Sequence, residues 1–152
     1  MFIKLSNKVK AYGICLYKIE NKKIKIFLCK SINSKKKWGF LKGSALEKEK
    51  PILTAQREFL EESGIITYIK DYEEYFEQKN NKKDIGIWLL NTDKISSFDK
   101  YFEKDTLKEN FLSMEISKAK FFDIKKLPKI KNNQKFLIQE IIDFLQNKNQ
   151  FH

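Results

Sequence analysis

The segment from Gly43 to Ile65 reads GSALEKEKPILTAQREFLEESGI and carries its own start and stop signals for a helix. Pro51 suits the first helical position, because its missing N–H and fixed φ cost nothing there. Gly64 suits the left-handed residue that commonly follows the last turn of a helix. These two residues predict a helix over Pro51–Ser63.

The predicted helix has two different faces at 100° per residue. One arc, which we expect to pack on the core, holds the apolar residues Ile52, Leu53, Phe59 and Leu60. The opposite side holds the carboxylates Glu58, Glu61 and Glu62.

This carboxylate cluster is electrostatically unfavourable. Glu58 and Glu62 are like charges at i and i+4, which costs about 0.2 to 0.5 kcal/mol, and anions are disfavoured near a helix C-terminus. A hard divalent cation would relieve both costs, since Mg²⁺ takes oxygen ligands and typically uses carboxylates plus substrate phosphates. The pattern therefore favours a Mg²⁺ site, for which Mn²⁺ is a possible substitute.

Basic residues dominate the composition. The chain has a formal net charge of +11 and 31 Lys plus Arg, and Arg57 is the only arginine. A planar guanidinium at position 57 can hold a carboxylate at two points and orient it, which an ammonium does less well. The lysine excess has two readings: a positive field for polyphosphates or RNA, or a biased composition on a solvated surface.

The length and composition limit the class of protein. With 152 residues and 41% hydrophobic content, we expect one folded domain over residues 1–152. No apolar run is long enough to span a membrane and no secretory signal is apparent, so we expect a cytoplasmic protein. Cys15 and Cys29 lie in apolar, strand-like runs and are expected to be buried reduced thiols. The only histidine is His152, so any metal must be held by oxygens.

The remaining elements follow from apolar patterning and turn signals. A hairpin is expected from the first two strands, and one helix with an apolar stripe that includes Phe136 closes the chain. The segment Thr92–Asn110 is expected to be loop or short helix. The expected strands are Lys8–Lys18, Ile24–Cys29, a short one within Trp38–Gly43, Ile65–Ile69, Tyr72–Gln78, Asp84–Asn91 and Ala119–Ile124, and the closing helix is Asn133–Asn147.

The spacing Gly43, five residues, Glu49, seven residues, then REFLEESGI over residues 57–65 resembles the box of the Nudix hydrolases at every specified position: G-x5-E-x7-R-E-U-x-E-E-x-G-U, with U a bulky apolar residue. The resemblance implies an α/β fold, an α/β/α sandwich with a mixed central β-sheet. It also implies Mg²⁺-dependent hydrolysis of a nucleoside diphosphate linked to another group. A non-catalytic nucleotide-binding module that keeps this fold is the alternative from a different class.

The resemblance also implies roles for individual residues. Arg57, Glu58 and Glu61 are the expected catalytic residues, and Glu49 could support Arg57 or a second metal. Glu115 precedes Phe121 by six residues, which is similar to a family pattern that completes the metal site. Members differ in which glutamate is the general base, so that choice stays open. The expected metal ligands are the Gly43 carbonyl, Glu58, Glu61, Glu62 and Glu115.

The substrate is indicated by the approach to the box. Residues 38–43 read WGFLKG, which resembles the W-x-F-P-K-G of members that act on dinucleoside polyphosphates, with Leu41 in place of proline. Diadenosine tetraphosphate is the expected substrate, and the alternative is triphosphorylated RNA that loses pyrophosphate. DNA is not an expected partner, and the oligomeric state is open. Phe76 or Tyr75 is expected to stack on a base, Trp38 and Phe40 are expected in the core, and the expected phosphate contacts are Lys10, Lys42 and Lys83.

Overall fold

A computed structural model describes residues 8–33 and 36–149. Within these residues an eight-stranded mixed sheet has the order β4-β5-β1-β2-β8-β7-β6, with β3 paired to β1. The central strands β1 (Val9–Glu20) and β5 (Lys83–Asn91) run parallel, and the other pairs run antiparallel. Both are buried on two faces, which explains why their sequences are nearly continuous apolar runs.

The expected hairpin is confirmed, since β1 pairs with β2 in a register that joins Glu20 to Lys23. Asn21 and Lys22 form the turn, both with positive φ. The other strands are β2 (Lys23–Ser31), β3 (Leu41–Ser44), β4 (Tyr75–Gln78), β6 (Phe102–Glu103), β7 (Thr106–Leu107) and β8 (Ile116–Asp123).

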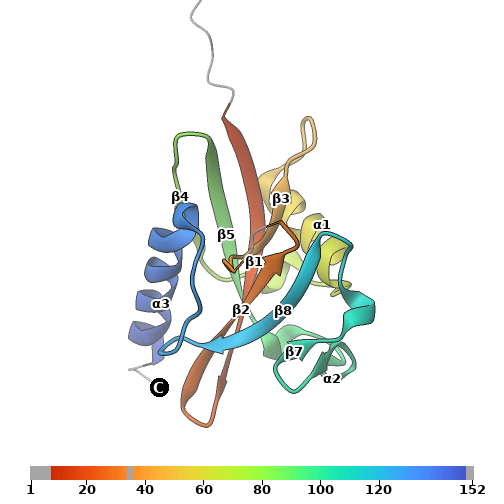
Figure 1. Ribbon diagram of the computed structural model, residues 1–152, viewed down its shortest axis with the longest axis vertical. Coiled ribbons are helices and arrows are strands. Elements are labelled where there is room, and N and C mark those ends of the chain that lie inside the picture. The colour runs from red at the N-terminus through yellow and green to blue at the C-terminus, as the bar shows by residue number, and fades with distance from the viewer. Residues whose placement is uncertain (1–7, 34–35, 150–152) are drawn as a thin grey trace, which may run out of the picture.

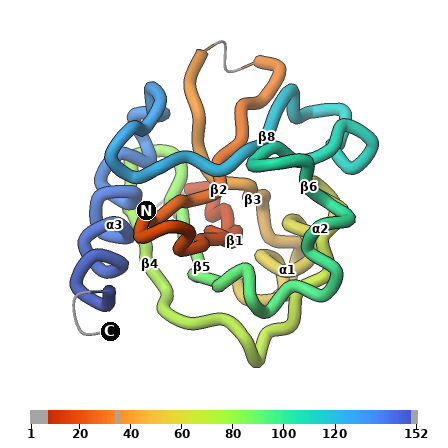
Figure 2. The backbone as a smooth tube through the Cα atoms, turned by 90° about the horizontal axis from the view of Figure 1, so that it is seen from below, coloured from red at the N-terminus to blue at the C-terminus, as the bar shows by residue number. Residues whose placement is uncertain are grey.

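Helices cover the sheet from both sides, so the expected α/β/α sandwich is confirmed. The helix α1 (Pro51–Ser63) lies on one face and α3 (Lys135–Asn149) on the other (Figures 1 and 2). Alternate residues of β1 supply the two cores: Tyr12 and Ile14 pack in the core under α1, whereas Cys15 packs in the core under α3. Both cysteines are buried free thiols, as expected.

The helix α1 has the predicted bounds, and Gly64 caps it in the left-handed conformation with φ 72°. Its predicted core face was partly wrong, because Leu53 and Leu60 are 41% and 45% exposed. The buried side of α1 comprises Thr54, Ala55, Phe59, Glu62 and Ser63. The helix is thus rotated so that Glu62, expected on the opposite side, is turned toward the sheet.

The segment after α1 also differs from the prediction. Ile65–Ile69 forms no strand, and a 3₁₀ turn covers Ile69–Asp71. Only the last four residues of the expected strand Tyr72–Gln78 are regular, although Glu73 and Glu74 still exchange backbone hydrogen bonds with Leu89.

The segment between residues 92 and 110, expected to be loop or short helix, contains the short helix α2 (Phe98–Tyr101) but also the short strands β6 and β7, which were not predicted. The closing helix begins at Lys135, two residues later than expected, after the 3₁₀ turn Asn132–Gln134. Phe136 was expected in its apolar stripe but is 63% exposed. Trp38 and Phe40 are buried, as expected.

In the part of the chain that the structure describes, no helix is both long and apolar enough to cross a membrane. The ends of the predicted domain 1–152, including His152, and residues 34–35 of the lysine-rich loop lie outside the described residues.

Candidate active site

The site forms where α1 packs on the paired strands β1 and β3. Gly43 of β3 lies opposite Tyr12 of β1, and the Glu58 side chain reaches down from α1 onto the Gly43 backbone. A Cβ atom built at Gly43 would fall within the Glu58 carboxylate. Glycine at this position therefore lets a carboxylate and a main-chain carbonyl lie next to each other.

Arg57 organises the carboxylates around it. Its Nε donates to Glu49 Oε2 at 2.8 Å and its Nη2 donates to Glu49 Oε1 at 2.9 Å, which is a two-point ion pair. Its Nη1 donates to Glu58 Oε1 at 3.0 Å and to Glu61 Oε1 at 3.2 Å. The guanidinium thus holds three carboxylates and uses its planar geometry to do so.

Glu49 is fixed by further donors. Its Oε1 accepts the Leu46 N–H at 3.0 Å and the Thr54 hydroxyl at 2.7 Å. The hydrogen bonds from Arg57, followed by the one from the Leu46 N–H, lower the pKa of Glu49 to about 2. Glu49 is therefore an anchor for Arg57 and the loop before α1.

Glu62 is the most unusual carboxylate of the site. It is 9% exposed, and its Oε1 has no hydrogen-bond partner among the described residues. Burial, and then the charge of Glu58, raises the pKa of Glu62 to about 8 against the attraction of Lys42. A buried carboxylate with an unpaired oxygen is costly unless a cation compensates it.

Glu115 comes close enough to the same cluster for its charge to act on Glu62. It immediately precedes β8, and its carbonyl accepts the Ile32 N–H at 3.0 Å. Its charge adds to those that raise the pKa of Glu62. The structure therefore brings Glu115 and the box glutamates into one acidic region.

Lys42 lies between acidic and basic groups. Burial, and then the charges of Lys83 and Lys131, lowers the pKa of Lys42 to about 8, whereas Glu62 acts in the opposite direction. Lys42 pairs with Gly13 and Lys83 pairs with Val9, which places both lysines on the α3 side of the sheet.

Lys10 is on the other face and pairs with Asp84. Of the three predicted phosphate contacts, Lys42 and Lys83 therefore lie together and Lys10 is separated from them.

The two candidate aromatic residues face opposite sides. Phe76 is partly buried in the core under α3, with its ring 5.5 Å from that of Phe144 and nearly perpendicular to it. Tyr75 lies across Gly86 on the α1 side, with its ring 4.4 Å from that of Trp88. Only Phe76 shares a face with Lys42 and Lys83.

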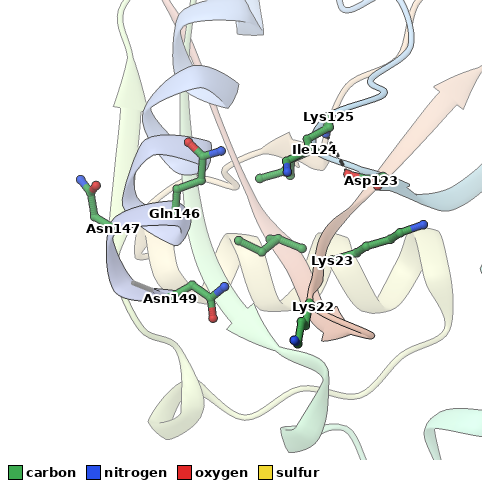
Figure 3. A pocket seen from close by; sticks show the side chains of 9 residues that line it. Lys22, Lys23, Asp123, Ile124, Lys125, Gln146, Asn147 and Asn149 are labelled. Atoms are coloured by element: carbon green, nitrogen blue, oxygen red, sulfur yellow. Dashed lines mark hydrogen bonds between the residues drawn. The ribbon is translucent and has the colours of Figure 1, made fainter. Parts of the chain in front are cut away.

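A cavity of about 420 Å³ lies away from these residues, at the β1–β2 turn. Figure 3 shows the side chains around it, which come from the turn, the end of β8 and the last turns of α3. Tyr12 and Glu20 are separated by roughly 26 Å along β1, at ~3.3 Å per residue. This cavity is therefore not part of the carboxylate site.

The residues present fit a divalent metal. The donor set is all oxygen, Glu62 offers an unpaired buried oxygen, and Gly43 leaves room for a carboxylate beside its carbonyl. Within residues 8–33 and 36–149, no three acidic, cysteine or histidine side chains are already gathered tightly enough to hold an ion. In this arrangement Arg57 instead bonds to Glu58 and Glu61.

Two participants were missed from the sequence. Thr54 bonds to Glu49, and its hydroxyl four residues after Lys50 could have suggested a role in the helix N-terminus. The positive charge of Lys131 lowers the pKa of Lys42. The sequence did not predict this interaction, because it depends on how the segment before α3 folds back.

Comparisons with known proteins agree with this geometry. The family model described as NUDIX domain matches residues 8–141. No curated protein sequence matches the chain.

Solved structures share the fold at low identity. One is a Caenorhabditis elegans Ap4A hydrolase binary complex, with TM-score 0.64, 23% identity and coverage of 91% of this chain and 98% of that chain. A second is the NUDIX domain of Shewanella oneidensis NrtR complexed with ADP ribose, with TM-score 0.63, 13% identity and coverage of 91% and 88%. A third is a NUDIX hydrolase of Listeria monocytogenes, with TM-score 0.64, 14% identity and coverage of 91% and 94%.

The family match covers most of the chain, and within it Arg57 binds the carboxylates that the sequence pattern singled out. The chain therefore belongs to the NUDIX family, as a pyrophosphohydrolase.

Proposed function

We propose that this protein hydrolyses a pyrophosphate bond in a dinucleoside polyphosphate such as diadenosine tetraphosphate. The observation that carries the proposal is the position of Lys42, which lies next to Gly43 in β3 and is close enough to Glu62, Lys83 and Lys131 for the charges of all three to act on it. An acidic region suits a metal ion, and an adjoining basic region suits the phosphates of an extended substrate.

The cofactor in this proposal is Mg²⁺, with Mn²⁺ as a possible substitute. Its ligands would come from the Gly43 carbonyl and from Glu58, Glu61, Glu62 and Glu115. When bound, such an ion neutralises phosphate charge and lowers the pKa of a water molecule. Either effect helps an anionic polyphosphate to accept a nucleophile.

The protein groups orient the reactants and move the proton. Arg57 holds Glu58 and Glu61 in place, and Glu49 anchors Arg57 through two hydrogen bonds. One glutamate of the site takes the proton of the attacking water, whose oxygen bonds to phosphorus while the bridging P–O bond breaks. Glu58 and Glu61 are our candidates, because both carboxylates are oriented by the same guanidinium.

The phosphate contacts in this proposal are Lys42 and Lys83 on the α3 side of the sheet, and Lys10 on the α1 side, the side of the box glutamates. Phe76 is the base-stacking candidate, since it shares a face with the two lysines. The likeness to the Ap4A hydrolase from C. elegans supports this substrate class. The likeness to an ADP-ribose complex makes ADP-ribose the natural competitor.

A second candidate is removal of pyrophosphate from triphosphorylated RNA. The net charge of +11 favours it, because lysines attract a polyanion and release counterions when it binds. RNA hydrolysis would fall steeply as salt rises, since several phosphates contribute to binding.

A substrate panel tests the proposal. Rates with Mg²⁺ are measured for diadenosine tetraphosphate, ADP-ribose, NADH, nucleoside triphosphates and 5′-triphosphate RNA, and the products are identified. A Glu58→Gln variant purified in parallel controls for contaminating hydrolases. The proposal requires the highest kcat/KM for the dinucleoside polyphosphate. A faster reaction with RNA would establish the second candidate, and nucleotide binding without turnover would indicate a non-catalytic module.

A further inference from the structure

The segment before α3 folds back along the strand that leads into the acidic region. The Trp38 N–H donates to the Lys129 carbonyl at 2.9 Å, and the Lys131 N–H donates to the Trp38 carbonyl at 3.0 Å. These bonds make a parallel bridge between Trp38 and Ile130. The backbone of Lys131 therefore lies beside Trp38, four residues before Lys42.

Gln134 fixes this arrangement. Its side chain is fully buried, and its Oε1 accepts the Phe40 N–H at 2.8 Å. The amide also lies across Gly39, where a Cβ atom would come within 2.6 Å of its Oε1. The segment carrying Lys131 is thus held rigidly against residues 38–40.

The loop before Lys83 reaches the same segment. Asn80 Nδ2 donates to the Lys83 carbonyl at 2.8 Å and to the Asn133 carbonyl at 3.1 Å. These hydrogen bonds join the segment that carries Lys131 to residues 38–40, which lead to Lys42, and to the loop before Lys83.

These lysines have little local counter-charge, since the Glu62 carboxyl is the acidic group that acts on Lys42. Lys83 and Lys131 both act on Lys42, and none of the three forms an ion pair among the described residues. By contrast, Lys18 and Lys25 are each held by Asp105 at 2.7 Å. Three ammonium groups that have no ion-pair partner in the described part of the chain attract an anion.

We propose that Lys131 joins Lys42 and Lys83 in a phosphate-binding subsite that recognises phosphates beyond the one attacked. Along the strand, Gly43 faces the acidic region on the α1 side, Lys42 is next to it on the α3 side, and the backbone of Lys131 lies beside Trp38, farther from Gly43. A longer polyphosphate chain would reach Lys131, and a diphosphate would end before it. Lys131 thus sets the preference for substrate length, an inference that rests on the proposed function.

The test compares diadenosine tetraphosphate with ADP-ribose in wild type, Lys131→Gln, Lys131→Arg and the control Lys129→Gln. Lys129 is an exposed lysine two residues away, and only its backbone contacts Trp38. Lys131→Gln should raise KM for the tetraphosphate about tenfold, as expected for one charge-assisted contact, with kcat unchanged. In Lys131→Gln, KM for ADP-ribose should change less than twofold. Lys131→Arg keeps the positive charge and should keep KM for the tetraphosphate close to that of wild type. The control Lys129→Gln should match wild type with both substrates.

Equal KM changes for the two substrates, or a loss of kcat without a change in KM, would overturn the proposal. Binding of inorganic tripolyphosphate, measured by calorimetry on the same proteins, separates this inference from the proposed function. If no substrate is hydrolysed, the proposed function fails, and the subsite still requires about tenfold weaker tripolyphosphate binding by Lys131→Gln. Equal binding by wild type and Lys131→Gln would exclude the subsite.

Discussion

The Glu58 carboxylate lies against the backbone of Gly43, in the space that a Cβ atom at position 43 would fill. At the centre of the site, α1 therefore contacts β3 because the Glu58 side chain fills the space that the missing side chain of Gly43 leaves.

Gly43→Ala should damage both stability and activity. The added methyl group must displace Glu58 or the backbone, which costs about 1 to 3 kcal/mol as overpacking. Displacement of Glu58 should also lower kcat about 100-fold, because small misplacements of catalytic groups have large effects on rate. Urea unfolding and kinetics check the two effects. Wild-type activity in Gly43→Ala would show that the contact with Glu58 is dispensable.

Arg57→Lys should keep the positive charge but lose the planar arrangement of hydrogen-bond donors. A lysine cannot make the two parallel bonds to Glu49 while also reaching Glu58 and Glu61. We expect kcat to fall about 100-fold with a folded protein, since the glutamates lose their common orienting group. Far-UV circular dichroism and steady-state kinetics measure this. A lysine variant as active as wild type would mean that Arg57 supplies only charge.

Phe59→Ala and Leu60→Ala should differ strongly in stability. Phe59 is fully buried, so its truncation should cost about 3 to 5 kcal/mol. Leu60 is 45% exposed, and its truncation should change stability by only about 0.5 kcal/mol. Thermal and denaturant unfolding of the two variants gives the comparison. Similar losses would imply that α1 packs in a different rotation from the one observed.

The rotation of α1 illustrates what the sequence could and could not predict. Pro51 and Gly64 are local signals, so the bounds of the helix were predicted correctly. Which side faces the sheet depends on the neighbouring strand, where Gly43 leaves room for Glu58 and the helix turns Glu62 inward. The apolar pattern of the helix predicted Leu53 and Leu60 in the core, because the sequence alone does not show the space beside Gly43.

The candidate site shows the same division. The short, specific spacing of the box predicted that Arg57 orients glutamates of the helix, and in the structure Arg57 donates hydrogen bonds to Glu58 and Glu61. Lys131 could not be predicted, because it approaches Lys42 only through the bridge between Trp38 and Ile130, two residues far apart in the sequence.

Glu49 should make the unfolding free energy of the protein depend on pH in the acidic range. Its pKa lies at about 2 in the folded protein, mainly through the Arg57 hydrogen bonds, against an ordinary value of 4.5. A lowered pKa means that the stabilisation is fully present above pH 4.5 and is lost as the pH falls towards 2.

Wild type and Glu49→Gln should be compared by denaturant unfolding from pH 7 to pH 2.5. The loss of unfolding free energy in the variant should be greatest at pH 7 and should shrink steadily below pH 4.5. Asp105 and the other acidic groups titrate in both proteins, so the difference isolates Glu49. A difference that is independent of pH would contradict the assigned role of the Arg57 pair.

The central claim is that glutamates of α1, among them the buried Glu62, hold a divalent cation for pyrophosphate cleavage, and Glu62→Gln tests it most directly. This change keeps the shape of the side chain and removes the charge of a carboxylate whose Oε1 is buried and unpaired. The variant should fold about as stably as wild type at pH 7, because burial raises the pKa of Glu62 to about 8 and the carboxyl is already largely neutral there.

The measurement is the initial rate of diadenosine tetraphosphate hydrolysis as a function of Mg²⁺ concentration, for wild type and Glu62→Gln. Wild type should show a saturable requirement for Mg²⁺, and the folded variant should be slower by about 1,000-fold, as for loss of a major electrostatic contribution. A wild-type rate that persists in the presence of a chelator, or a Glu62→Gln variant with the same rate and Mg²⁺ dependence as wild type, would contradict the account.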